Sequence, residues 1–177
     1  MKKMYLSAPL PFVGQKRMFA KEFMKVLEQY PDGTLFVDLF GGSGLLSHIT
    51  KFLKPHSTVV YNDFDNYRFR MKHIPQTNLL LADIREMVGD SVPRHKIIKG
   101  ELRERIFSRI EQEENTTGYV DFITLSSSLL FSMKYKLSVQ DMRKEALYNN
   151  IRRTGYPECT DYLEGLEIVS CDYKEVF

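Results

Sequence analysis

The stretch Phe36-Val37-Asp38-Leu39-Phe40-Gly41-Gly42-Ser43-Gly44 decides the fold that this sequence predicts. Its first half belongs to the apolar run 35–39, which is bounded by glycines and predicts a short strand buried on both faces. A glycine-rich turn follows, and residues 45–53 then have a helical pattern that Pro55 closes. Because glycine has no Cβ, a ligand can approach such a turn closely, and the next helix offers free amide groups to it. The alternative is an ordinary tight turn between a strand and a helix.

The same alternation continues on both sides of this stretch. Apolar spacing predicts helices over 18–30 and 64–73, and short β-branched or apolar runs predict strands over 58–62 and 166–170. Helices that alternate with buried strands are typical of an α/β fold, here a doubly wound parallel sheet.

A mostly helical insertion, 76–164, interrupts this pattern, so that the α/β core consists of 1–75 and 165–177. Helices are expected at 79–88, 101–113 and 139–153. The apolar segment 118–137, with its serine cluster, is compatible with a strand or a helix.

The composition of the chain indicates a globular protein rather than a polycation. It has 177 residues, 43% of them hydrophobic, and a net charge of +2, so nucleic-acid binding would need a local basic face. Cys159 and Cys171 are not spaced like metal ligands, and two cysteines are too few for a disulfide framework. The four histidines show no catalytic or metal-ligand spacing. With no signal peptide and no apolar run of membrane-spanning length, we expect a cytoplasmic protein without a membrane segment.

Acidic residues close two neighbouring predicted strands. Asp63 lies about 20 positions after the glycine turn, where an acidic residue accepts the hydroxyls of a ribose, and Asp38 could reach the same pocket. The alternative for Asp63 is a helix N-cap. The turn lacks the Gly-x-Gly-x-x-Gly pattern of dinucleotide sites, which argues against a nicotinamide cofactor. At the N-terminus, the loop 9–17 carries Lys16 and Arg17, which could neutralise a carboxylate or simply be solvated.

Four segments together resemble the Dam-type (D12 class) DNA adenine-N6 methyltransferases. In the order that this family has, they are Pro11-Phe12-Val13-Gly14-Gln15-Lys16, the stretch 36–44, Tyr61-Asn62-Asp63 and Ser170-Cys171-Asp172-Tyr173. The resemblance implies a Rossmann-like methyltransferase sheet that binds S-adenosyl-L-methionine. It implies that Lys16 lies near the methionine end, Asp63 near the ribose and Asp172 at the adenine amino group. The expected cofactor-binding residues are Phe12, Lys16, Asp38, Phe40, Gly41, Gly42, Gly44, Asp63, Asp172 and Tyr173.

The resemblance also implies that the insertion 76–164 recognises double-stranded DNA with an adenine target, as in DNA methylation and restriction-modification. Basic and aromatic residues are interleaved there, a pattern that suits phosphates and bases. They are Arg94, His95, Lys96, Lys99, Lys134, Tyr135, Lys136, Arg143, Lys144, Tyr148, Arg152, Arg153 and Tyr156. A solvated helical surface is the alternative, because acidic residues dilute this charge.

The sequence departs from the family in one respect. Family members hold the target amino group with an Asp/Asn-Pro-Pro-Tyr/Phe tetrapeptide, and no two prolines are adjacent in this chain. We therefore expect the N-terminal part of such an enzyme, with no catalytic residue of its own, no metal site and no activity alone. The first strand should then be an exposed edge, covered by a second polypeptide that carries the catalytic half or by another copy of the chain. The alternatives are a degenerate, non-enzymatic module that binds DNA or a partner, and a methyltransferase of RNA or small molecules.

Overall fold

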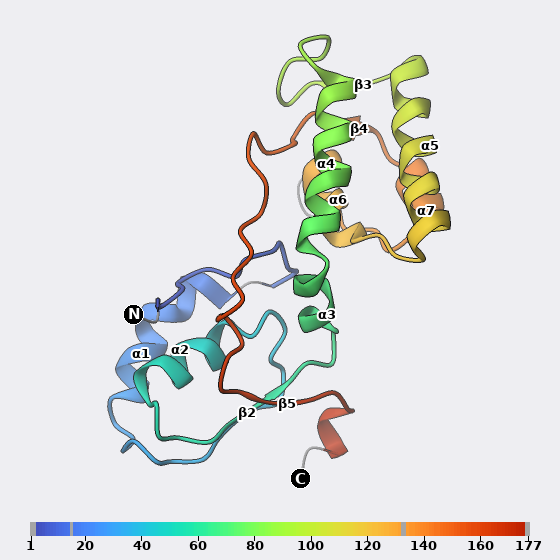
Figure 1. Ribbon diagram of the computed structural model, residues 1–177. Coiled ribbons are helices and arrows are strands. Elements are labelled where there is room, and N and C mark those ends of the chain that lie inside the picture. Colours follow the sequence, from blue (N-terminus) through green and yellow to red (C-terminus); the bar gives the residue numbers. More distant parts are fainter. Residues whose placement is uncertain (1–2, 15, 132–133, 176–177) are drawn as a thin grey trace. The chain divides into compact units, whose positions relative to one another are not determined.

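The computed structural model describes residues 3–14, 16–131 and 134–175, so that Gln15 of the N-terminal motif lies outside the described residues (Figure 1). The chain divides into two compact units. The first consists of Met1–Lys72 and Glu158–Phe177, and the second of His73–Pro157. The segment 158–164, which we assigned to the insertion, therefore groups with the first unit.

A small parallel sheet organises the first unit. Its strands are β1 (Phe36–Asp38), β2 (Val59–Asn62) and β5 (Glu167–Val169), in the order β1-β2-β5. Figure 1 shows β2 and β5 running side by side. The central strand β2 is largely buried, whereas β1 is half-buried and lies at one edge of this sheet. The prediction that β1 is buried on both faces is wrong, because all three of its residues are only half-buried. The predicted edge position agrees with the strand order.

Helices connect these strands and cover the sheet. The order is η1 (Lys16–Phe19), α1 (Ala20–Leu27), α2 (Leu45–Leu53), α3 (Tyr67–Lys72) and, after β5, the short η2 (Tyr173–Glu175). Helix α2 has the predicted bounds, and it buries Leu45 and Ile49. The predicted α/β alternation is thus present in a small sheet of parallel strands.

The segment after Pro157 is held in the first unit by Tyr162. The Tyr162 ring is fully buried and stacks on His48 of α2, with ring centroids 4.9 Å apart. Its hydroxyl donates to the Ser43 carbonyl at 3.0 Å, which ties the segment to the glycine turn. These contacts explain why 158–164 belongs with the sheet.

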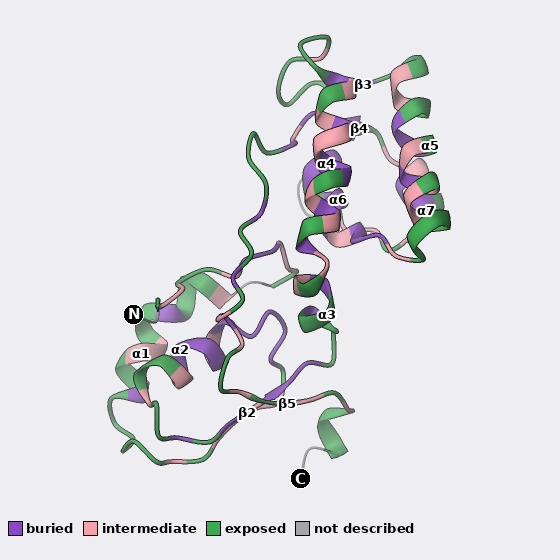
Figure 2. Cartoon of the chain, viewed as in Figure 1, coloured by how far each residue is buried: buried purple, intermediate pink, exposed green. Residues whose placement is uncertain are grey.

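The second unit is a helical cluster with one short antiparallel ladder. It contains α4 (Ile74–Val88), α5 (Gly100–Thr117), α6 (Phe122–Leu129) and α7 (Val139–Arg143), while β3 (Ile97–Ile98) pairs with β4 (Leu147–Tyr148). Figure 2 shows buried and exposed bands alternating along α4, as expected for an amphipathic helix. The core of the second unit is apolar and is formed by side chains of α4, α5 and α6. The fully buried residues include Leu80, Leu81, Ile84, Ile106, Phe107, Ile110, Leu125 and Leu129.

Some predicted elements of the second unit need correction. Helix α4 begins at Ile74, before the predicted start, because Pro75 sits in the first turn, where a missing N–H costs little. The undecided segment 118–137 contains helix α6, which Asp121 caps by accepting from the Thr124 amide at 3.0 Å. The helix predicted over 139–153 ends at Arg143, because the residues beyond it leave the helix to pair β4 with β3.

Among the described residues, each helix is too short or too polar to cross a lipid bilayer. The same residues place no group of three or more His, Cys, Asp or Glu side chains where they could share a metal ion.

Candidate functional site

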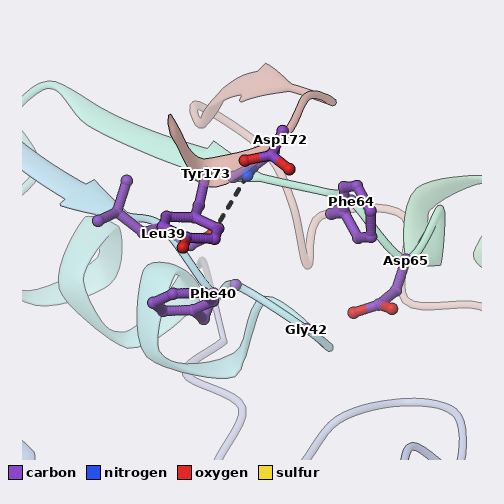
Figure 3. A pocket seen from close by; sticks show the side chains of 9 residues that line it. Leu39, Phe40, Gly42, Phe64, Asp65, Asp172 and Tyr173 are labelled. Carbon is purple, nitrogen blue, oxygen red and sulfur yellow. Dashed lines mark hydrogen bonds between the residues drawn. The ribbon is translucent and has the colours of Figure 1, made fainter. Parts of the chain in front are cut away.

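A cavity of about 320 Å³ lies in the first unit at the carboxyl ends of the parallel strands (Figure 3). Its lining comes from the three segments that follow β1, β2 and β5, namely Leu39, Phe40, Gly41, Gly42, Asn62, Phe64, Asp65, Asp172 and Tyr173. Ligands of open α/β sheets bind in the crevice outside the carboxyl ends of the strands. The cavity therefore lies where this fold class binds its ligands, and its volume lies in the range of small-molecule sites.

Asn62 joins the three segments beneath the cavity. Its amide nitrogen donates to the Leu39 carbonyl at 3.2 Å and to the Cys171 carbonyl at 3.0 Å, and its oxygen accepts from the Cys171 amide at 3.2 Å. The side chain is nearly fully buried, so these bonds are shielded from water. The sequence offered Asn62 only as part of the acidic motif; its structural role depends on the pairing order of the strands.

The glycine turn is shaped by packing against Tyr61. A Cβ on Gly41 would lie 2.3 Å from the Tyr61 ring, and Gly42 adopts a positive φ of 51°. The Tyr61 hydroxyl lies 2.7 Å from the Gly42 carbonyl oxygen and 3.0 Å from Asp63 Oδ1. Burial, reinforced by the Asp63 carboxylate, raises the pKa of Tyr61 well above its ordinary value. A neutral tyrosine thus fixes the turn and permits only glycine at position 41.

Asp63 and Asp65 have different surroundings. The Asp63 carboxylate is 4% exposed and accepts from the backbone amides of Tyr67 at 2.6 Å and Arg68 at 2.9 Å, which makes it the cap of α3. It does not line the cavity, whereas Asp65, which is exposed, does. Asp63 therefore has the role that the sequence analysis gave as the alternative, a helix cap. Asp65, rather than Asp63, lines the cavity. Both residues follow β2 closely, and the sequence alone does not tell which of them turns toward the helix.

Aromatic side chains surround the cavity and remain exposed. Phe40 is 64% exposed and Phe64 65% exposed, and the rings of Phe40 and Tyr173 lie 5.2 Å apart with a 43° tilt. Figure 3 shows Phe40 and Tyr173 together on one side of the cavity, with Phe64 and Asp65 on the other and Asp172 between them. Large apolar side chains gathered at one exposed site indicate a binding surface.

The remaining expected cofactor residues lie around the turn without lining the cavity. Phe12 packs edge-on against Tyr67, with centroids 5.8 Å apart, and would contact a Cβ at Gly42. Lys16 Nζ donates to the Phe40 carbonyl at 3.1 Å, and Asp38 accepts from the Ser47 hydroxyl at 2.6 Å. Gly44, with φ of 70°, caps the start of α2. Of the ten expected residues, the cavity lining contains Phe40, Gly41, Gly42, Asp172 and Tyr173.

Several basic residues of the second unit are paired with acidic ones. Arg143 contacts Glu104 at 2.7 Å and Glu111 at 3.0 Å, and Lys144 contacts Asp141 at 2.6 Å. The basic cluster predicted from sequence is therefore partly neutralised within the unit, and its role in DNA binding stays a prediction.

Comparison with known proteins points to one relative. The chain is 42% identical over 179 residues, 99% of its own length, to a Haemophilus influenzae protein named "Putative methyltransferase". It spans 60% of the length of that relative. A scan against models of protein families finds no match, and no solved structure matches the chain. The similarity supports a relationship to a methyltransferase.

Proposed function

We propose that the first unit binds S-adenosyl-L-methionine in the cavity formed by the segments after β1, β2 and β5. The observation that carries this proposal is the convergence of the three segments on one cavity of about 320 Å³, with Asp65 and Asp172 in its lining. We infer that the small sheet is part of a Rossmann-like doubly wound sheet, as the order of the four motifs implies. The name of the Haemophilus influenzae relative supports the same reading.

The chemistry of the cavity suits an adenosyl group that carries no phosphate. Its lining has two carboxylates, Asp65 and Asp172, and contains no Lys, Arg or His among the described residues. Carboxylates accept hydrogen bonds from hydroxyl and amino groups and attract a positively charged sulfonium, whereas they repel phosphates. The site therefore favours S-adenosylmethionine over dinucleotides and nucleoside triphosphates.

Each polar group then has a defined task. Asp65 accepts the ribose hydroxyls, in place of Asp63, which holds the start of α3. Asp172, whose Oδ1 also accepts from the Lys174 amide at 2.9 Å, reads the adenine amino group. Phe40, Tyr173 and Phe64 pack on the adenosyl rings and exclude water from them.

We further propose that the chain is the cofactor-binding part of a DNA adenine-N6 methyltransferase. When bound, the cofactor supplies an electrophilic methyl group, and the protein supplies orientation and electrostatics. The present residues hold and orient the cofactor, while the tetrapeptide that grips the target amino group is absent from the sequence. These residues should therefore bind cofactor without methylating DNA, and the segment that supplies the tetrapeptide should pair with the free edge of β1.

Two assays test this function together. Isothermal titration calorimetry with S-adenosylmethionine, with ATP as the negative control, should give saturable binding of the first ligand alone. Transfer of a radioactive methyl group to adenine-containing duplex DNA should stay at background. Methylation by the purified chain alone would contradict the assigned absence of catalytic groups, and a failure to bind the cofactor would favour a degenerate module that binds DNA or a partner.

A further inference from the structure

A second cavity, of about 270 Å³, lies within the second unit. Its lining includes Ser127 and Phe131 at the end of α6, then Lys134 and Tyr135, and finally Asn150 after β4. Hydroxyl, ammonium, amide and aromatic groups thus face one space, a combination that the first cavity lacks.

Lys134, the cationic residue of this lining, is already paired with a carboxylate of the chain itself, which is not part of the lining. Glu145 accepts a salt bridge from Lys134 at 2.5 Å and another from Lys136 at 3.1 Å. The hydrogen bond from Lys134, followed by that from Lys136, lowers the pKa of Glu145, so the carboxylate is ionised at neutral pH. Two ammonium groups that converge on an oxyanion form the arrangement that binds a phosphate.

The aromatic side of the cavity presents an unprotected ring. Phe131 is 61% exposed, and its ring lies against that of Tyr148, at 5.8 Å between centroids and 57° between planes. Exposed aromatic rings beside cations act as stacking platforms for unpaired bases.

Two further polar residues line the cavity, Asn150 and Ser127. The side-chain nitrogen of Asn150 donates to the Leu130 carbonyl at 3.0 Å, and its side-chain oxygen lies 2.9 Å from His95 Nδ1. Ser127, in contrast, is exposed, and its hydroxyl makes no hydrogen bond to another described residue. A hydroxyl of this kind can bond to a phosphate or to a base edge.

We propose that this cavity binds one unstacked nucleotide of a DNA strand, with its phosphate on Lys134 and its base on Phe131, and that Glu145 occupies the phosphate position until DNA displaces it. The choice of DNA as the polymer rests on the proposed function. The carboxylate of Glu145 is then a built-in competitor, and its removal should strengthen binding rather than weaken it.

The test measures fluorescence anisotropy of labelled DNA over a range of salt concentrations, without S-adenosylmethionine. The probes are a duplex with one unpaired adenosine and the same duplex fully paired. Glu145→Gln should bind both probes several-fold more tightly, and its slope of log affinity against log salt should steepen by about one to two, because two lysines become free for phosphates. The matched control is Glu86→Gln, which makes the same change of charge at an exposed position of α4.

The ring is tested by Phe131→Leu, which keeps an apolar side chain but removes the stacking surface. It should weaken binding to the unpaired probe by roughly 5- to 150-fold and abolish the preference for that probe. Leu137→Ala, at another exposed apolar position of the unit, should keep the preference.

The proposal is overturned if Glu145→Gln binds no more tightly than Glu86→Gln, or if Phe131→Leu keeps the preference for the unpaired base. Melting curves of each variant verify that it is folded. Cofactor binding is measured separately by calorimetry. A negative result with DNA therefore does not affect the proposal that the first unit binds the cofactor, and a negative calorimetric result does not affect the DNA measurement.

Discussion

At the scale of single residues, the two aspartates after β2 separate a structural role from a binding role. Asp63 is buried and holds two backbone amides of α3, whereas Asp65 lines the cavity. The sequence predicted that an acidic residue follows β2, and it predicted Phe40, Asp172 and Tyr173, all of which line the cavity. It could not choose between Asp63 and Asp65, because the choice depends on where α3 begins and which carboxylate its free amides take.

This difference predicts that two alanine substitutions change different properties, the stability of the fold in one case and the cofactor affinity in the other. Asp63→Ala should lower the free energy of unfolding by about 1 kcal/mol, the cost of a lost N-cap. Asp65→Ala should leave the melting temperature unchanged and weaken cofactor binding about tenfold, since bonds to a charged acceptor are lost. Thermal denaturation and calorimetry on both variants measure these effects. A weaker affinity for Asp63→Ala than for Asp65→Ala, in folded protein, would reverse the assignment.

At the scale of elements, close packing of tyrosines against the glycine turn and α2 fixes the loops of the first unit. The turn after β1 was foreseeable, since its glycines stand directly after an apolar run. The tyrosines that require those glycines were not, because Tyr61 and Tyr162 reach the turn from distant parts of the sequence. The pairing of β3 with β4 was not predicted either, because strands of two residues are too short to show a periodicity in the sequence.

The packing of Gly41 predicts a steric defect. Gly41→Ala would bring a methyl group within 2.3 Å of the Tyr61 ring, so the ring or the turn must shift. We expect a loss of about 1–3 kcal/mol in the free energy of unfolding, the usual cost of overpacking. Urea denaturation measures this loss, and wild-type stability in Gly41→Ala would mean that the turn is looser than described.

The tyrosines also predict how stability depends on pH. Burial raises the pKa values of Tyr61 and Tyr162, and the hydrogen bond to Asp161 raises that of Tyr5, above the ordinary value of 10.0. The unfolded chain loses these protons first, so the contribution of these tyrosines to the free energy of unfolding should be constant below about pH 10 and fall as the pH rises further. Tyrosinate absorbance should therefore appear for these residues only as the protein unfolds. Their ionisation in the folded protein at pH 10 would contradict this.

At the scale of the whole molecule, the edge of β1 is the feature most open to a partner. Leu35 beside it is 61% exposed, and β1 has a neighbour on one side only within the described sheet. Exposed apolar edges pair with other chains. The prediction of an edge came from the missing tetrapeptide, whereas the grouping of 158–164 with the sheet could not be foreseen, because it depends on the stacking of Tyr162 on His48.

This edge predicts self-association of the purified chain at high concentration. Leu35→Lys should suppress the association, because a charge blocks pairing at an edge, whereas Leu79→Lys, at an exposed position of α4, should not. Light scattering over a range of protein concentrations distinguishes these cases. A monomer at every concentration, with the wild-type sequence, would show that β1 does not recruit another copy.

The central claim, that the cavity after the three parallel strands binds an adenosyl cofactor, is tested most directly by calorimetric titration of the chain with S-adenosylmethionine. The account predicts one saturable site with a dissociation constant on the order of 1–100 μM. It also predicts that Asp65→Ala and Asp172→Ala weaken this binding while Asp90→Ala, at an exposed position outside the cavity, does not. Absence of binding heat in folded protein, or equal affinity in all three variants, would contradict it.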